Sequence, residues 1–220
     1  MKTIVVTGAS RGIGRAVTER FIREGYFLIG TSTTGNVAFT HENLKVFRLD
    51  LSDPKSIERC ADEIRDFGRK IDILINNAGI AVEEEATEPH VVTEYLRKTL
   101  EVNLVGVVDF TERIIPLMNK GGQIINISSR AGSLAHTEYT LNYPAYRISK
   151  AALNMVTRIL AVRLAGKIKV SSIHPGWVKT DMGGDEADIT PEEVAEDIFT
   201  LINSDVETGQ FWFKGEKFPW

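Results

Sequence analysis

Tyr146 and Lys150 stand four positions apart, and together they could handle a proton. In a helix, side chains at that spacing lie on one face, one turn from each other. Free tyrosine has a pKa of about 10, and bringing it near 7 takes about 4 kcal/mol. One positive charge about 4 Å away supplies about that amount at an effective dielectric near 20. Lys150 could therefore make Tyr146 a working acid and base, although the pair alone is more typical of an amphipathic surface helix.

A glycine motif near the start of the chain has the flanks of a phosphate-binding site. The β-branched run 3–6 predicts a strand, and apolar residues after the motif recur at helical spacing until Gly25. Between them stands Thr7-Gly8-Ala9-Ser10-Arg11-Gly12-Ile13-Gly14. Glycines permit a tight turn and close backbone approach, and the helix N-terminus faces the phosphates. The pattern therefore favours a dinucleotide site over an ordinary strand–helix turn.

The second predicted strand, 26–31, indicates which dinucleotide binds. Enzymes that use NAD usually carry an acidic residue near the end of this strand, bonded to the ribose 2′-hydroxyl. Here residues 30–36 include hydroxyl and amide side chains and no acid, and Arg11 lies in the glycine motif. A guanidinium and hydroxyls suit a 2′-phosphate, and no carboxylate repels it. We therefore expect NADP(H) to be favoured over NAD(H).

Polar and turn residues follow the later predicted strands, 44–49, 71–75, 122–127 and 168–174. They are Asp50, Asn76-Asn77-Ala78-Gly79, Ser128-Ser129 and Pro175-Gly176, and a last short strand is predicted at 209–213. Strands that alternate with helices predict an α/β fold. We expect a Rossmann-type three-layer sandwich, with a mostly parallel sheet of six or seven strands and helices on both faces. Because ligands bind at the carboxyl ends of such strands, the polar residues are candidates for one site.

Other features of the chain bear on the surroundings of that site. A long helix is predicted over 91–118, and Asn103 in its apolar stretch is either a structural clamp or part of a water relay. The acidic run 82–89 is interpreted as a solvated rim. His174 is interpreted as a packed residue at a strand end, and Cys60 as a small core residue.

Composition bounds the class of protein. The chain has 220 residues, 43% of them hydrophobic and 25% charged, which suits one domain over residues 1–220. A net charge of -4 argues against a nucleic-acid or anionic-membrane surface. The single cysteine excludes a disulfide within the chain and fits a reducing, cytoplasmic location. We identify no signal peptide and no membrane span, and we expect no metal.

Taken together, these motifs resemble the short-chain dehydrogenase/reductase family over essentially the whole chain. The resemblance rests on the glycine motif, Asp50, residues 76–79, Asn103, Ser129, Tyr146-x-x-x-Lys150 and Pro175-Gly176, in that order. The stretch 176–184 and the final Phe218-Pro219-Trp220 are similar to one subgroup of the family. That subgroup contains the sniffer-type carbonyl reductases and the C-factor-like proteins.

The resemblance implies roles for four catalytic residues. Tyr146 would exchange a proton with the substrate oxygen, and Lys150 would lower the Tyr146 pKa and hold the nicotinamide ribose. Ser129 would hydrogen-bond the substrate oxygen, and Asn103 would hold a water that links Lys150 to solvent. The cofactor-binding residues that it implies are Gly8, Ser10, Arg11, Ile13, Gly14, Thr33, Asp50, Leu51, Asn77, Gly79, Tyr146, Lys150, Pro175, Val178 and Thr180.

Two departures from the family pattern affect the site. The serine and the tyrosine are further apart than usual, with 136–142 as the insertion, so Ser128 or Ser133 is the alternative to Ser129. The substrate-loop segment, about 177–190, is short, which suggests an open pocket and loose specificity. The pocket candidates are Ala81, Val82, Ala131, Trp177 and Met182.

The resemblance implies an NADP(H)-dependent oxidoreductase that transfers a hydride between the nicotinamide and a carbonyl or alcohol carbon of a small molecule. The alternative is a cofactor-binding signalling or regulatory protein of the C-factor type, and a third option is a structural domain without ligand. A complete catalytic set argues for the enzyme, since a pure sensor need not keep a proton relay. The long helices around Asn103 and Tyr146 could pair across a twofold axis as a homodimer.

Overall fold

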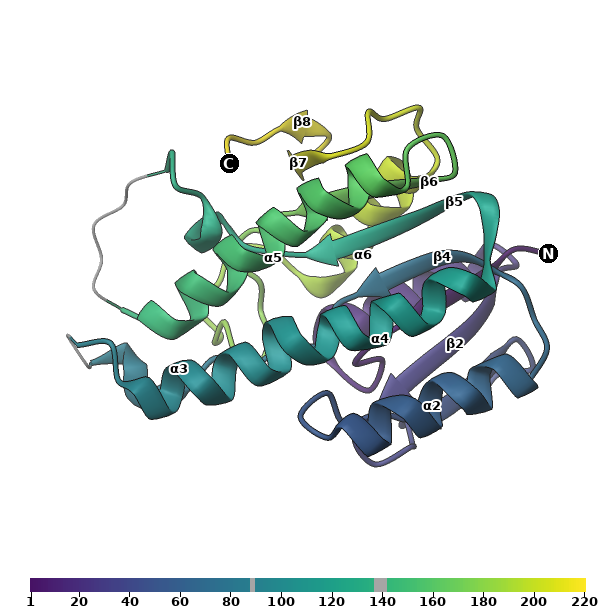
Figure 1. Ribbon diagram of the computed structural model, residues 1–220, viewed down its shortest axis with the longest axis horizontal. Helices are drawn as coiled ribbons and strands as arrows, with labels where there is room; N and C mark the ends of the chain where they lie inside the picture. The colour runs from purple at the N-terminus through teal and green to yellow at the C-terminus, as the bar shows by residue number, and fades with distance from the viewer. Residues whose placement is uncertain (88–89, 137–141) are drawn as a thin grey trace.

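The computed structural model describes residues 1–87, 90–136 and 142–220. Its strands are β1 (Thr3–Val6), β2 (Phe27–Ser32), β3 (Leu44–Arg48), β4 (Ile71–Asn76), β5 (Met118–Ile127), β6 (Ile168–Ile173), β7 (Gln210–Phe213) and β8 (Glu216–Lys217). They form one sheet in the order β3-β2-β1-β4-β5-β6-β7-β8, with helices on both faces (Figure 1). Neighbouring strands are parallel except β7 and β8. The predicted three-layer α/β fold is confirmed.

The sheet exceeds the six or seven strands that we expected. Strand β8 pairs antiparallel with β7 as a hairpin. The turn between them contains Lys214, with φ 48°, and Gly215, with φ 78°. Positive φ at both positions is typical of a type I′ turn, which matches the twist of the flanking strands. Such turns usually carry Asn-Gly or Asp-Gly, so Lys-Gly is a weak signal for a hairpin.

Two hydrophobic layers hold the sheet between its helices. The helices are α1 (Gly12–Arg23), α2 (Pro54–Asp66), α3 (Thr93–Leu100), α4 (Val107–Ile114), α5 (Pro144–Arg163) and α6 (Pro191–Ile202). Side chains of β1 alternate between the layers: Val5 packs on the side of α2, α4 and α5, whereas Ile4 and Val6 pack on the side of α1 and α6. Figure 1 shows α2, α4 and α5 on the near face. Because both faces are covered, the central strand β1 is buried along its whole length.

The long helix predicted over 91–118 is divided into shorter segments. Helix α3 leads into a π-helical turn, Glu101–Gly106, followed by α4 and a 3₁₀ turn at Ile115–Leu117. A Cβ on Gly106 would lie 2.0 Å from the Leu51 carbonyl oxygen, so the π-helical turn packs directly on the loop after β3. Pro116, inside the 3₁₀ turn, has no N–H to donate, so α4 does not extend through it.

The acidic run 82–89 departs from the expected solvated rim at Glu85. Residues Glu83–Ala86 form a 3₁₀ turn in which Glu84 is exposed and Glu85 is completely buried. A hydrogen bond to the start of α5 holds Glu85 inside. Glu88 and Pro89 lie outside the described residues. The interpretation of His174 as a packed residue and of Cys60 as a core residue is confirmed, because both side chains are buried.

Candidate active site

A cleft of about 1300 Å³ opens at the carboxyl ends of the parallel strands. Its walls come from the glycine loop between β1 and α1, the loops after β2 to β6, and the first turns of α5. Most of the expected site residues line it: Gly8, Ser10, Arg11, Ile13, Thr33, Asp50, Leu51, Asn77, Gly79, Ser129, Tyr146, Lys150, Pro175, Val178 and Thr180. The expected catalytic and cofactor-binding residues that do not line the cleft are Gly14 and Asn103.

The glycine loop presents backbone N–H groups to the cleft. Gly8, with φ 71°, and Gly12, with φ 52°, adopt the left-handed conformation that glycine takes without strain. A Cβ on Gly14 would lie 2.1 Å from the Gly8 carbonyl oxygen, so Gly14 lets the loop close. Arg11, the N-cap of α1, makes no side-chain capping hydrogen bond. The first N–H groups of α1 are therefore available to an anion, and the loop fits the diphosphate of a dinucleotide.

The buried side chain of Asn103 clamps the loop after β4. Its Oδ1 accepts from the Ile80 N–H at 2.8 Å, and its Nδ2 donates to the Ile80 carbonyl at 2.8 Å. The same Nδ2 also donates to Ser149 Oγ, on α5, at 3.1 Å. Of the two alternatives for this asparagine, the side-chain contacts show the structural clamp. The water relay that the family resemblance implies stays a prediction.

Ser129, Tyr146 and Lys150 converge in the cleft. The Tyr146 side chain interacts with that of Ser129, which stands just after β5. Lys150, one turn further along α5, places its Nζ 5.5 Å from the centre of the Tyr146 ring. That Nζ donates to the Ile127 carbonyl at 2.8 Å. A Cβ on Gly79 would lie 3.6 Å from the same Nζ, so the loop after β4 also reaches this cluster.

Burial changes the protonation of both ionisable groups. It raises the pKa of Tyr146, and the Ser129 hydrogen bond offsets part of that rise. It lowers the pKa of Lys150 to about 8. We predicted that Lys150 would lower the Tyr146 pKa, and the structure shows the opposite direction. The cost of burying a phenolate is the larger effect, because the Lys150 ammonium is directed at the Ile127 carbonyl.

Of the three candidate serines, Ser129 is the one that contacts Tyr146. Ser128 and Ser133 instead donate their hydroxyls to backbone carbonyl groups, at 3.4 and 2.8 Å. Ser129 Oγ also accepts from the Ala131 N–H at 3.1 Å, which fixes its position at the start of a 3₁₀ turn. This geometry favours Ser129 over the alternatives, and its catalytic role stays a prediction.

The substrate side of the cleft is open and partly apolar. Trp177 and Met182 line it with 50% and 51% of their surfaces exposed. Trp177 Nε1 donates to the Gly183 carbonyl at 2.7 Å, so the short substrate-loop segment is folded on itself. Ala81 also lines the cleft, whereas the lining does not include the predicted Val82 and Ala131. Positions 137–141 of the predicted insertion lie outside the described residues.

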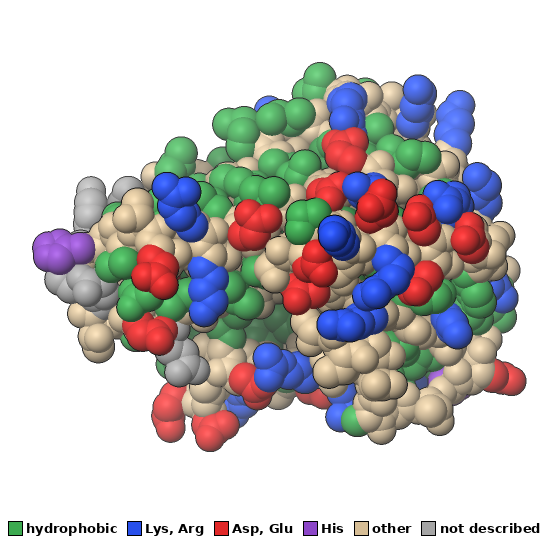
Figure 2. All heavy atoms as spheres, turned by 60° about the horizontal axis from the view of Figure 1, so that its bottom comes forward, with side chains coloured by type: hydrophobic (Ala, Val, Ile, Leu, Met, Phe, Trp, Pro, Cys, Tyr) green, Lys and Arg blue, Asp and Glu red, His purple; other side chains and the backbone are tan. Residues whose placement is uncertain are grey.

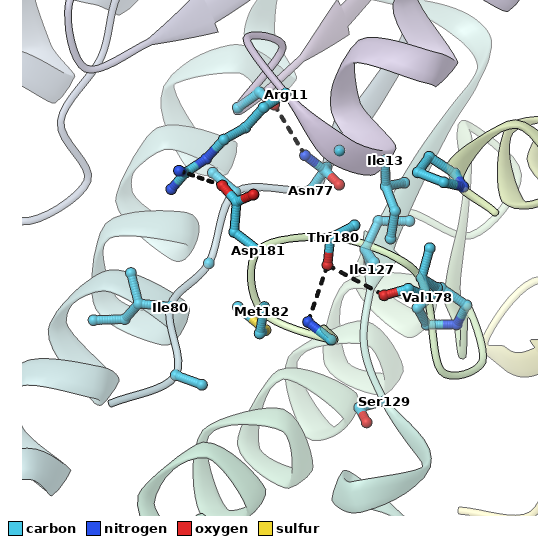
Figure 3. Close-up of a pocket in the computed structure, with 18 of the residues that line it drawn as sticks. Arg11, Ile13, Asn77, Ile80, Ile127, Ser129, Val178, Thr180, Asp181 and Met182 are labelled. Atoms are coloured by element: carbon cyan, nitrogen blue, oxygen red, sulfur yellow. Dashed lines mark hydrogen bonds and ion pairs between the residues drawn. The ribbon is translucent and has the colours of Figure 1, made fainter. Parts of the chain in front are cut away.

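An ion pair joins two walls of the cleft. Arg11 Nη1, in the glycine loop, lies 2.6 Å from Asp181 Oδ2, in the substrate-loop segment (Figure 3). A Cβ on Gly12 would lie 3.1 Å from Thr180 Cγ2, so the same two segments also pack together. The sequence contains no local signal for the Asp181 contact. Arg15, which also lines the cleft, was missed although it stands one helical turn after Arg11.

The described part of the chain also bears on three other possibilities: a metal site, a membrane-spanning helix and a nucleic-acid-binding surface. Within 1–87, 90–136 and 142–220, no three His, Cys, Asp or Glu side chains are grouped so that they could hold a metal ion. None of the helices in those ranges is long and apolar enough to cross a bilayer. On the face in Figure 2, acidic and basic side chains are interspersed. That face therefore lacks the continuous basic patch that is typical of nucleic-acid binding.

The fold and the cleft together define a class of protein: an oxidoreductase with a dinucleotide loop and a Ser–Tyr–Lys set at the strand ends of a parallel sheet. Comparison with known sequences agrees. The chain belongs to the short chain dehydrogenase family, whose sequence model matches residues 2–189. The matched range includes the glycine loop and the helix that carries Tyr146 and Lys150.

Relatives and solved structures support this assignment. The serine 3-dehydrogenase of Agrobacterium fabrum is 34% identical over 186 residues, which are 81% of this chain and 73% of that protein. The NADPH-bound carbonyl reductase from chicken fatty liver has a TM-score of 0.90 at 28% identity and covers 100% of this chain and 94% of its own. The carbonyl reductase Sniffer of D. melanogaster has a TM-score of 0.88 at 28% identity, with 100% of both chains covered.

Proposed function

We propose that this protein is an NADP(H)-dependent carbonyl reductase in which Tyr146 donates the proton. The observation that carries the proposal is that the Tyr146 and Ser129 side chains interact inside a cleft that a dinucleotide loop also lines. Because burial raises the Tyr146 pKa, the phenol keeps its proton at neutral pH. A protonated phenol is the form that can give a proton to a carbonyl oxygen.

In this proposal, each residue of the site would have a separate role in catalysis. Bound NADPH would supply the hydride. Tyr146 would give its proton to the carbonyl oxygen, and Ser129 would donate a hydrogen bond to that oxygen as negative charge develops. Lys150, held by the Ile127 carbonyl, would contribute a positive charge beside them. The Asn103 clamp would keep the loop after β4 and helix α5 in register around the substrate.

Several observations support NADP(H) over NAD(H). The end of β2 carries hydroxyl side chains and no acid, and Thr33 lines the cleft. Arg11 and Arg15 line the same region, and Arg48 Nε donates to the Thr33 carbonyl at 3.1 Å. These guanidinium groups suit a 2′-phosphate. The carbonyl reductase from chicken fatty liver, which shares the fold, is bound to NADPH.

The substrates that best fit the cleft are bulky or varied carbonyl compounds. The exposed Trp177 and Met182 leave the substrate side open, and the short substrate-loop segment covers little of it. The similarity to two carbonyl reductases, one of them Sniffer, supports placement in the sniffer-type subgroup.

A screen of aldehydes, ketones and quinones tests this proposal. We expect the purified protein to oxidise NADPH in the presence of some of these compounds, and to use NADH at least tenfold less efficiently. Cofactor loss is followed by absorbance, and NADPH affinity is measured separately by fluorescence. Tight NADPH binding without turnover of any compound would contradict the enzyme and favour a cofactor-binding regulatory protein.

A further inference from the structure

Glu85 is a completely buried carboxylate outside the cleft lining. It belongs to the 3₁₀ turn Glu83–Ala86, and its Oε1 accepts from the Ala145 N–H at 3.0 Å. Within the described part of the chain, its Oε2 has no hydrogen-bond partner. Burying a carboxylate costs free energy of folding unless hydrogen bonds or charges compensate for the lost water. The burial of Glu85 therefore needs an explanation in terms of what its hydrogen bonds hold in place.

The first turn of α5 lacks the usual local cap. Its N-cap, Tyr143, is in the left-handed conformation (φ 54°, ψ 51°) and makes no side-chain capping hydrogen bond. Pro144 has no N–H to be satisfied. The N–H groups on either side of this proline both bond to Glu85: Tyr143 N–H donates to its carbonyl at 3.2 Å, and Ala145 N–H donates to its carboxylate. A negative charge at this end of a helix is also favourable.

We propose that Glu85 is a positioning residue that caps α5 from a distance and so holds Tyr146 against Ser129. Tyr146 directly follows the capped Ala145, within the first turn, where an uncapped helix frays. Lys150 stands a full turn later and has its own anchor in the Ile127 carbonyl. Loss of the cap should therefore move the phenol more than the ammonium. This inference rests on the proposed reductase function.

Steady-state kinetics of Glu85→Ala, Glu85→Gln and Glu84→Ala test the proposal. We expect Glu85→Ala to lower kcat roughly 10- to 100-fold, because small misplacements of a reacting group have effects of that size. The KM for NADPH should stay within about threefold, because the cofactor loop is elsewhere. Glu85→Gln keeps the Oε1 acceptor and should retain kcat within about threefold. Glu84→Ala, at the exposed neighbour in the same turn, is the matched control and should behave as wild type.

Amide hydrogen exchange of residues 143 and 145–147 provides a readout that does not depend on turnover. We expect these amides to exchange about tenfold faster in Glu85→Ala and to stay protected in Glu85→Gln. If Glu85→Ala does not fold, Glu85→Asp withdraws the carboxylate by one methylene and should change both readouts in the same direction. An alanine variant with wild-type kcat and wild-type protection would overturn the proposal. A wild-type protein without turnover would instead refute the reductase function, and exchange would still test the cap.

Discussion

Burial shifts the pKa values of three groups that line the cleft, in each case toward the neutral form. It raises the pKa of Tyr146, lowers that of Lys150 to about 8, and lowers that of His174 to about 4, to which Arg130 and His136 add. At neutral pH, Tyr146 is therefore a phenol, His174 is uncharged and Lys150 is mostly an ammonium. Of these three groups, Lys150 is the one that supplies charge.

The shifted pKa of His174 predicts a loss of stability in acid. The unfolded chain takes up a proton near pH 6.5, whereas the folded protein resists until about pH 4. The free energy of unfolding should therefore fall by about 3 kcal/mol as pH drops through that window. His174→Asn removes the titrating ring and keeps an acceptor for the Gly176 N–H, which His174 Nδ1 binds at 3.2 Å. Urea unfolding at pH 7 and pH 4 should show a smaller loss in the variant, and equal losses would refute the assignment.

Among the elements, the segment 218–220 holds the loop that follows Ser129. The Pro219 carbonyl accepts from Ser133 Oγ and the Trp220 carbonyl accepts from the Ala135 N–H, both at 2.8 Å. The Phe218 ring packs against three aromatic rings of the strand ends and β7, those of His174, Phe211 and Phe213. This segment therefore acts as a brace for one wall of the cleft.

Phe218→Ala should loosen that brace. We expect a loss of about 2 kcal/mol in the free energy of unfolding, because several aromatic contacts disappear together. The KM for the carbonyl substrate should rise, and NADPH affinity should change little, because the glycine loop is remote from Phe218. Leu134→Ala, at a side chain that is 83% exposed on the same loop, is the control and should change the free energy of unfolding by less than about 0.5 kcal/mol. Denaturant unfolding and steady-state kinetics together would show whether the brace exists.

Local patterns predicted most of the elements and many of the site residues. The glycine loop and the Tyr146–Lys150 face each occupy a few consecutive positions, so neighbouring residues are enough to reveal them. The Glu85 cap joins residues 60 positions apart, and sequence spacing carries no signal for it. The direction of the Tyr146 pKa was mispredicted because it depends on burial and on the carbonyl that Lys150 binds.

At the scale of the whole molecule, the cleft is lined by the loops that follow β1 to β6. A ligand bound there contacts several of these loops at once. We therefore expect bound NADPH to oppose global unfolding. At a free concentration of 100 times its Kd, it should add about 2.7 kcal/mol to the free energy of unfolding. For a domain of this size, that corresponds to a rise in Tm of roughly 5–10 °C. Thermal unfolding with equal concentrations of NADPH and NADH should show the larger rise with NADPH, and the reverse order would contradict the proposed cofactor preference.

The most direct test is a comparison of the wild-type protein with Tyr146→Phe under the same conditions. The substitution removes one hydroxyl, and with it the proposed proton donor. We expect kcat for carbonyl reduction to fall roughly 10²- to 10⁴-fold, while the Kd for NADPH stays within about twofold. A phenylalanine variant that reduces the same carbonyl at close to the wild-type rate would show that the proton comes from another group.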